Sequence, residues 1–237
     1  MDIGKSFRFV FEDKKWIEKV LIGGILMLVP ILGSILMMGY VVELVRNVRK
    51  HEIEPLPEWD KWGEKITDGI KLLVILLVWS LPLLLLEIIL LIPMSIMDSS
   101  DTGNTIAAFL SLCFGCFTLI YVIVLMLANP SIVIKFAETG DISAGFKFGE
   151  ILDYTKEHLS QIVVALIVGL LAYALAGIIG SLLCVIGLVF TFFWANTVQY
   201  HMIAQIGLAP EPSERPLETL SQAEPAEELP ETSQSNE

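Results

Sequence analysis

Four long stretches of this chain contain almost no charged residues, and they restrict its possible folds more than any other feature. Val20–Val42, Thr105–Ile134 and Leu159–Ile206 contain no Asp, Glu, Lys or Arg, and Leu72–Met97 contains only Glu87. A helix that crosses a bilayer needs about 20 predominantly apolar residues. The stretches therefore predict helices that cross a membrane.

The last stretch is 48 residues long, which is too long for one crossing and fits two that turn within Gly180–Gly187. The short polar connection Asp98–Asn104 predicts that the helices on either side of it form an antiparallel pair. We therefore predict four crossings, at residues 72–97, 105–134, 160–181 and 184–206.

The composition agrees with this interpretation. Hydrophobic residues make up 54% of the 237 residues, charged residues make up 18%, and the mean hydropathy is +0.70. This composition excludes disordered, collagen-like and disulfide-framework proteins. The chain is also too apolar to be an ordinary water-soluble domain. The expected fold class is all-α, a polytopic membrane helical bundle with interfacial amphipathic helices.

The first apolar block, residues 20–45, has two interpretations because Pro30 and Gly33 lie in its middle. It is either a single kinked crossing or a re-entrant hairpin. A hairpin keeps all 15 basic residues on the cytoplasmic side, whereas a single crossing leaves five of them outside, which the positive-inside bias disfavours. We expect a re-entrant hairpin whose Pro30 turn packs against the other helices, with both termini in the cytoplasm.

The net charge of −12 is mainly a property of the C-terminal end. Residues 211–237 hold eight Glu and one Arg, so they contribute −7. We expect a membrane domain over residues 1–209 and a disordered, acidic cytoplasmic tail over residues 210–237. The protein is expected in the cell membrane as a multi-pass protein.

Aromatic and cationic residues gather in segments that flank the apolar blocks. Asp2-Ile-x-x-x-Phe-Arg-Phe9 and Asp141-Ile-x-x-x-Phe-Lys-Phe148 match closely, and each precedes a polar stretch and then an apolar block that bends at a Gly. The match is either an internal repeat or a shared preference of interfacial helices. We predict membrane-surface anchors rather than ligand-stacking residues at Trp16, Trp59 and Trp62.

Glu87 is the acidic residue deepest in a predicted crossing. Placing a charged side chain there costs about 2.5–3.5 kcal/mol on insertion scales, so it is expected to face protein or water. Depth along the helices predicts a hydrogen bond to Asn196 or Thr191. The candidate intramembrane polar site therefore consists of Glu87, Asn196, Thr191, Asn129, Gln199 and His201. The alternative role of these residues is to form hydrogen bonds between helices. Asn129-Pro130 is expected to end the third crossing.

No catalytic, cofactor-binding or metal-binding motif stands in a usable context. Cys113-Phe-Gly-Cys116 lies inside an apolar helix without a second ligand pair, and His201 has no second His nearby. We expect no cofactor, no metal and no enzymatic activity.

Several short motifs resemble those of a known prokaryotic family. They are the run from Trp16 to Gly24, Pro30-Ile-Leu-Gly, Gly39-Tyr, Arg46-Asn-Val-Arg49, Pro55-Leu-Pro-Glu-Trp-Asp60 and Asp68-Gly69. Over residues 5–208 the chain resembles the integral membrane family catalogued as domain of unknown function 4013, and Pro55–Asp60 is its most specific part. The resemblance implies a membrane protein without an established activity.

The expected function is a packing, organising or binding role in the bilayer without turnover. The alternative is a small transporter or channel component that uses Glu87 and the polar face of the last helix. Membrane lipids are the expected partners, with anionic headgroups contacting the cytoplasmic side. A second copy of the chain or another membrane protein is a further candidate partner, and nucleic acid is not expected.

Overall fold

A computed structural model describes residues 1–96 and 101–208 of the chain. The predicted tail, residues 210–237, lies outside the described residues, as do residues 97–100. The described part is all-α, as expected. Its elements are α1 (Ile3–Glu12), α2 (Trp16–Met27), α3 (Pro30–Arg49), α4 (Trp62–Ile96), α5 (Asp101–Thr139), the 3-10 helix η1 (Ile142–Phe146), α6 (Phe148–Glu157), α7 (Leu159–Leu182) and α8 (Cys184–Ala204).

The first apolar block is divided into two helices rather than forming one kinked helix. α2 ends at Met27 and α3 begins at Pro30, where the fixed φ of proline favours the first helical position and its missing N–H leaves no bond unmade. Gly33 allows the two helices to approach closely, because a Cβ there would overlap the Leu26 carbonyl oxygen. At about 1.5 Å per residue, α2 is about 18 Å long and α3 about 30 Å.

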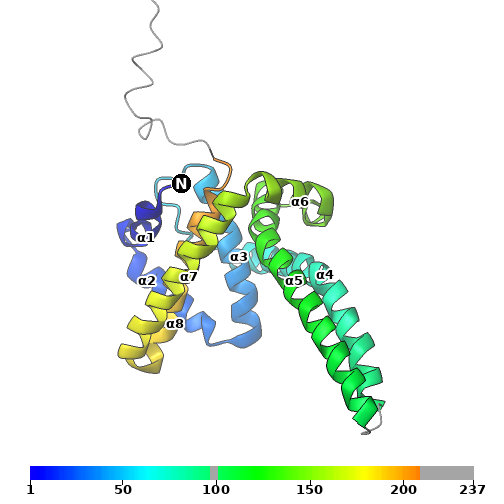
Figure 1. The fold of residues 1–237 in the computed structure, drawn as a ribbon. Helices are drawn as coiled ribbons and strands as arrows, with labels where there is room; N and C mark the ends of the chain where they lie inside the picture. The colour runs from blue at the N-terminus through cyan, green and yellow to red at the C-terminus, as the bar shows by residue number, and fades with distance from the viewer. Residues whose placement is uncertain (97–100, 209–237) are drawn as a thin grey trace, which may run out of the picture. The chain divides into compact units, whose positions relative to one another are not determined.

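Four described helices are long and apolar enough to cross a membrane: Pro30–Arg49, Trp62–Ile88, Ala108–Thr139 and Leu159–Leu182. Three of them coincide with predicted crossings, and the fourth is α3. The predicted crossing 184–206 corresponds to α8, which is not one of these four helices. It packs along α7 (Figure 1).

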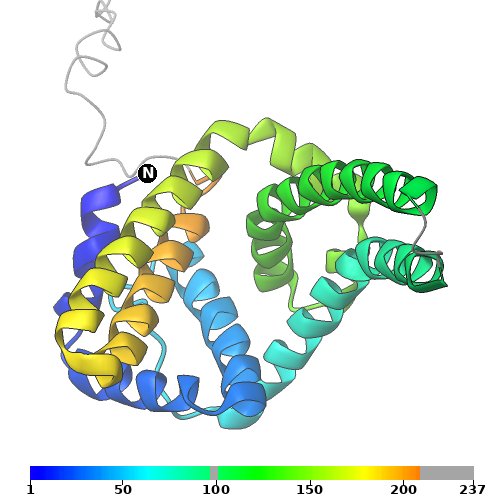
Figure 2. The ribbon, with the colours of Figure 1, turned by 60° about the horizontal axis from the view of Figure 1, so that its bottom comes forward.

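The third predicted crossing was given the wrong ends. α5 starts at Asp101 and continues through Asn129-Pro130 to Thr139. A proline inside a helix removes one backbone hydrogen bond and bends the helix without necessarily ending it. Figure 2 shows the change of direction within α5. Beyond Pro130, buried residues such as Ile132 and Phe136 keep the chain helical by packing in the core.

Several chain segments meet at one end of the membrane domain. The backbone N–H of Asp2 donates to Gln205 at 2.6 Å, Arg49 donates to the Ile206 carbonyl at 2.9 Å, and Lys71 donates to the Gly140 carbonyl at 3.1 Å. The N-terminus therefore lies beside the C-terminal end of α8, and the end of α3 lies there as well. We call this end the polar end of the domain.

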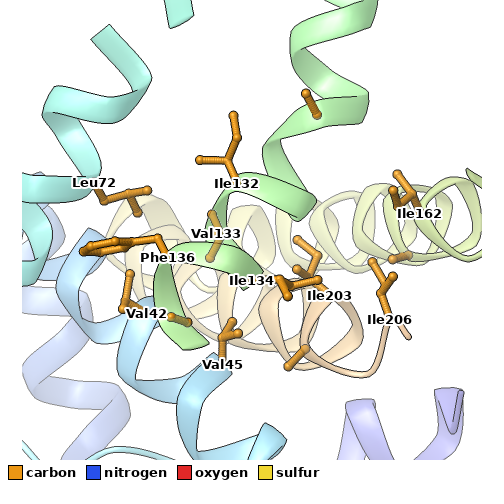
Figure 3. Packing of buried hydrophobic residues seen from close by; sticks show 14 of the residues in the cluster. Val42, Val45, Leu72, Ile132, Val133, Ile134, Phe136, Ile162, Ile203 and Ile206 are labelled. Carbon is orange, nitrogen blue, oxygen red and sulfur yellow. The ribbon is translucent and has the colours of Figure 1, made fainter. Parts of the chain in front are cut away.

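The main hydrophobic core also lies toward the polar end. Figure 3 shows that Val42 and Val45 of α3, Phe136 of α5, Ile162 of α7 and Ile203 of α8 converge there. These side chains are almost fully buried. Away from this core, α4, α5 and α7 expose many large apolar side chains, including Leu85, Leu112, Ile120 and Leu170.

The two matching sequence segments begin in similar ways and then differ. Asp2 caps α1 by accepting from the Lys5 N–H, and Asp141 caps η1 by accepting from the Ser143 N–H. Downstream, the landmark Pro30–Gly33 is the first turn of α3, and Cys184–Gly187 is the first turn of α8. The segments themselves differ, since the first forms an α-helix and the second a 3-10 helix, and the internal repeat stays a prediction.

Candidate binding pocket at the Pro55–Asp60 segment

The segment Pro55-Leu-Pro lies between α3 and α4, and side chains from earlier helices hold it. Three consecutive carbonyl oxygens each accept one hydrogen bond: Pro55 from Asn47 at 3.1 Å, Leu56 from Lys19 at 2.8 Å, and Pro57 from Tyr40 at 3.2 Å. All three residues of the segment are buried. Buried carbonyls need donors, and a segment with two prolines does not satisfy them by forming a helix.

Trp59 fixes the other end of the segment. Its ring stacks on Tyr40 at a centroid distance of 4.4 Å and on Trp62 at 5.5 Å, and its Nε1–H donates to the Lys19 carbonyl at 2.9 Å. Packing within the protein accounts for the position of Trp59. Trp62 is 40% exposed, and Trp16 packs edge-on against Phe11 at 5.1 Å. Membrane anchoring by these tryptophans stays a prediction.

The segment forms one wall of a pocket of about 380 Å³, which is also lined by α3 and the start of α4. Its lining is strongly charged, with five basic and seven acidic side chains. Two of the basic residues, Lys19 and Lys65, are 3% and 1% exposed. Lysine is almost never fully buried unless its charge is paired, so these two residues characterise the site.

Lys19 has acceptors for its ammonium group on several sides. Its Nζ lies 2.6 Å from Asp13 Oδ2, 2.8 Å from the Leu56 carbonyl oxygen and 3.2 Å from Glu58 Oε1. The Asp13 carboxylate also accepts from the Lys15 N–H at 2.7 Å. Lys19 is therefore a fully engaged structural cation that ties α2 to the segment.

Lys65 is bound less completely. Its Nζ lies 2.7 Å from Glu43 Oε2 and 3.9 Å from Asp60 Oδ1, yet no contact of this Nζ has hydrogen-bond geometry. The ion pair with Glu43 is close in distance but poorly aligned. Asp60 is itself held by the Lys61 N–H, a hydrogen bond that keeps the pKa of its carboxyl below the ordinary value.

Two arginines at the end of α3 connect the pocket to other helices. Arg46 donates to Asp68 at 3.2 Å and to the Ala137 carbonyl at 3.1 Å. Arg49 donates to the carbonyls of Ala204 and Ile206 and to Glu138 at 2.6 Å. A cation is favourable at a helix C-terminus, where the last carbonyls have no partner within the helix. Arg49 therefore joins α3 to the ends of α5 and α8.

A family model described as Protein of unknown function (DUF4013) matches residues 22–185. The chain belongs to this family. No curated protein and no solved structure matches the chain. The DUF4013 match is narrower than the predicted resemblance over residues 5–208. It contains the Pro55–Asp60 segment, Lys65 and both arginines, whereas Lys19 precedes it.

The intramembrane residues predicted in this DUF4013 protein are not gathered into one site. Asn196 donates to the Tyr173 hydroxyl at 3.1 Å, and Thr191 donates to the Ala176 carbonyl at 2.9 Å, so both bond to α7. The predicted hydrogen bond from Glu87 to either of them is wrong, since Asn196 Oδ1 is buried without a hydrogen bond and Glu87 lies on α4. Helix packing pairs α8 with α7, while α4 packs on α3 and α5.

The remaining predicted polar residues also make contacts between helices or lie elsewhere. Gln199 lies against α7, since a Cβ at Gly169 would come within 2.9 Å of its Cγ. His201 is buried, with Nδ1 2.8 Å from Ser6 Oγ and 3.0 Å from Gln205 Nε2, and it stacks on Phe9. Asn129 lies on α5, half-buried. α8 therefore directs its polar side chains to α7 and α1.

Among the described residues no group of three or more His, Cys, Asp or Glu side chains is arranged to hold a metal ion. Cys113 and Cys116 are exposed, free cysteines on α5. The charged pocket instead uses residues from the segments that flank the apolar blocks, which the sequence did not single out as a site. The one sequence signal for it was the Pro55-Leu-Pro run, whose carbonyls require donors from elsewhere in the chain.

Proposed function

We propose that this DUF4013 protein is a non-enzymatic, multi-pass membrane protein that binds a small polar ligand in the pocket at the Pro55–Asp60 segment. The observation that carries the proposal is the construction of this pocket. A loop whose three consecutive carbonyls are held by side chains closes a charged space of about 380 Å³. Ligand pockets commonly enclose about 300–1,000 Å³ and are largely formed before binding.

The lining favours binding over turnover. In the part of the chain that the structure describes, the pocket is lined by Lys, Arg, Asp, Glu, Asn, Gly, Leu and Pro, so it offers no hydroxyl, thiol or imidazole. Its two buried lysines each lie next to a carboxylate. Paired ammonium and carboxylate groups recognise polar ligands well and are poor nucleophiles.

We infer that the first apolar block enters the membrane and returns to the same side, and that both termini lie in the cytoplasm. Support comes from the polar end, where Asp2 contacts Gln205 and Arg49 contacts Ile206. Because α1 begins and α3 ends at this polar end, the chain from α1 to α3 makes no net crossing of the membrane. Reporter fusions after Lys15 and after Lys50 test this topology, which predicts the same cytoplasmic signal for both; opposite signals would reject it.

We further propose that lipid covers the apolar faces of α4, α5 and α7. The support is the exposure of large side chains such as Leu85, Leu112 and Leu170, which water would disfavour. The polar end carries the charged pocket. The bound ligand therefore lies near the level of the lipid headgroups in this proposal.

Native mass spectrometry of the full chain, released gently from detergent, tests the binding function. We expect the wild-type protein to retain a small molecule that Glu64→Trp loses, because Glu64 lines the pocket and its side chain is exposed. Glu150→Trp is the matched control, since Glu150 is also an exposed acid in the first turn of a helix. Identical bound species in all three proteins would reject the proposal.

A further inference from the structure

Lys65 is the feature of the pocket that its protein contacts do not satisfy. The two buried lysines are comparable in burial, yet Lys19 makes two hydrogen bonds and a further ion pair with Glu58. Lys65 has an ion pair with Glu43 at 2.7 Å but no contact in hydrogen-bond geometry. An ammonium group has three donors, and a buried donor without an acceptor is unfavourable. Lys65 lines the pocket, but its Nζ is enclosed, so an acceptor group of a ligand reaches these donors when the side chain turns toward the pocket.

The lining as a whole holds more acidic than basic side chains. Seven carboxylates against five cations leave an excess of negative charge around Lys65. Glu52 and Glu64 are exposed at the pocket, and neither is paired with a cation in the described part of the chain. A ligand that is only anionic meets this excess, and one that is only cationic meets the buried ammonium of Lys65.

We propose that the pocket binds a zwitterion, with its phosphate at Lys65 and its ammonium group at the carboxylates of Glu52 and Glu64. This inference rests on the proposed binding function and specifies the chemical class of the ligand. Both charges of such a ligand find partners, and charge-assisted hydrogen bonds are the strongest that the site can form. The same chemistry occurs in free phosphoethanolamine and in the headgroup of phosphatidylethanolamine.

Calorimetric titration of the full chain in a nonionic detergent compares phosphoethanolamine with inorganic phosphate and with ethanolamine. We expect phosphoethanolamine to bind at least tenfold more tightly than either half. Removing one charge-assisted contact weakens binding about tenfold, which is the expected effect of the double variant Glu52→Gln, Glu64→Gln. Lys65→Met is expected to abolish binding, and Glu150→Gln serves as the control.

The double variant keeps the test decisive if Lys65→Met does not fold, because Glu52 and Glu64 lie outside the ion pairs that hold the segment. A second arm adds phosphatidylethanolamine or phosphatidylglycerol to the micelles and measures the thermal midpoint. A midpoint raised by phosphatidylethanolamine alone identifies the headgroup as the source, and binding of phosphoethanolamine alone identifies a free molecule; both support the zwitterion.

Equal binding of phosphate and phosphoethanolamine, or an unchanged affinity in the double variant, would overturn the zwitterion. If no probe binds while Glu64→Trp still loses a retained small molecule, the zwitterion is wrong and the binding function stands. If no probe binds and no retained molecule depends on Glu64, water satisfies Lys65 and both proposals fail.

Discussion

Tyr40 and Trp59 stack with their ring centroids 4.4 Å apart and their planes at 22°. Two residues before Trp59, the Pro57 carbonyl accepts a hydrogen bond from the hydroxyl of the same tyrosine. One side chain of α3 therefore holds the Pro55–Asp60 segment through its ring face and through its hydroxyl. The position of the pocket wall depends on this residue.

Tyr40→Phe keeps the ring and removes the hydroxyl, leaving the Pro57 carbonyl without its donor. We expect a loss of about 1 kcal/mol in the free energy of unfolding. Tyr40→Leu removes the stacking as well and is expected to cost about 1 kcal/mol more. Denaturant unfolding in detergent measures both. Equal stability of Tyr40→Phe and the wild type would show that the hydroxyl contributes nothing to holding the segment.

The two neighbouring tryptophans are expected to differ in their access to lipid. Trp59 is packed between rings and donates to Lys19, whereas Trp62 is 40% exposed. In variants that retain one tryptophan each, brominated lipids are expected to quench the fluorescence of Trp62 more strongly than that of Trp59. Stronger quenching of Trp59 would contradict its position inside the protein.

Gly69 and Gly63 form a matched pair on α4. A Cβ at Gly69 would overlap the Ile35 carbonyl oxygen, while a Cβ at Gly63 would meet nothing within 4 Å. Gly69→Ala is expected to separate α3 from α4 and destabilise the protein by about 1–3 kcal/mol. Gly63→Ala is expected to stabilise it by about 0.5–1 kcal/mol, because alanine favours the helix. Similar unfolding midpoints for the two variants would argue against the close approach.

Arg49 bonds three acceptors that lie outside α3, so its loss is expected to be costly. Arg49→Met leaves the Ala204 and Ile206 carbonyls and Glu138 without their partner, and we expect a loss of about 2–3 kcal/mol. Lys147→Met removes an exposed pair with Glu150 and is expected to cost less than about 0.5 kcal/mol. Thermal unfolding and limited proteolysis after residue 200 measure the stability of both variants. An equal loss of stability in the two would show that Arg49 does not hold α3 to α5 and to the end of α8.

Asp141 provides a pH-dependent test of the cap on η1. Hydrogen bonds from Ser143 hold the pKa of its carboxyl below the ordinary value. The contribution of the carboxylate to stability is therefore complete above the pKa of the unfolded chain, about 3.9, and is lost as the pH falls through the lower folded pKa. We expect the stability difference between the wild type and Asp141→Ala to shrink on acidification from pH 6; a constant difference would exclude the cap.

The helices of this protein were predictable because the bilayer requires long uncharged stretches, and α4, α5 and α7 follow them. The break before Pro30 was also signalled by residue type. The continuation of α5 through Pro130 was not, since burial of Phe136 outweighs the lost hydrogen bond. The predicted partner of Glu87 was wrong, because the depth of a residue along its helix does not specify which other helix lies beside it.

The pocket was the part least open to prediction. Lys19 is one of five cationic residues before the first block, and nothing in its local sequence distinguishes it from Lys14 or Lys15. Its burial depends on the Leu56 carbonyl and on Asp13, which a tertiary fold brings to it. The pairing of Lys65 with Glu43 likewise depends on how α3 and α4 meet.

The hydrogen bonds that hold the Pro55–Asp60 segment set an order of assembly during synthesis. Lys19, Tyr40 and Asn47 all precede the segment, so the ribosome has already delivered every donor when Pro55 to Pro57 emerge. In contrast, Asp2 and Ser6 bond to Gln205 and His201, which are made about two hundred residues later. The pocket wall can form early, whereas the first helix reaches its final place only after the last one has been translated.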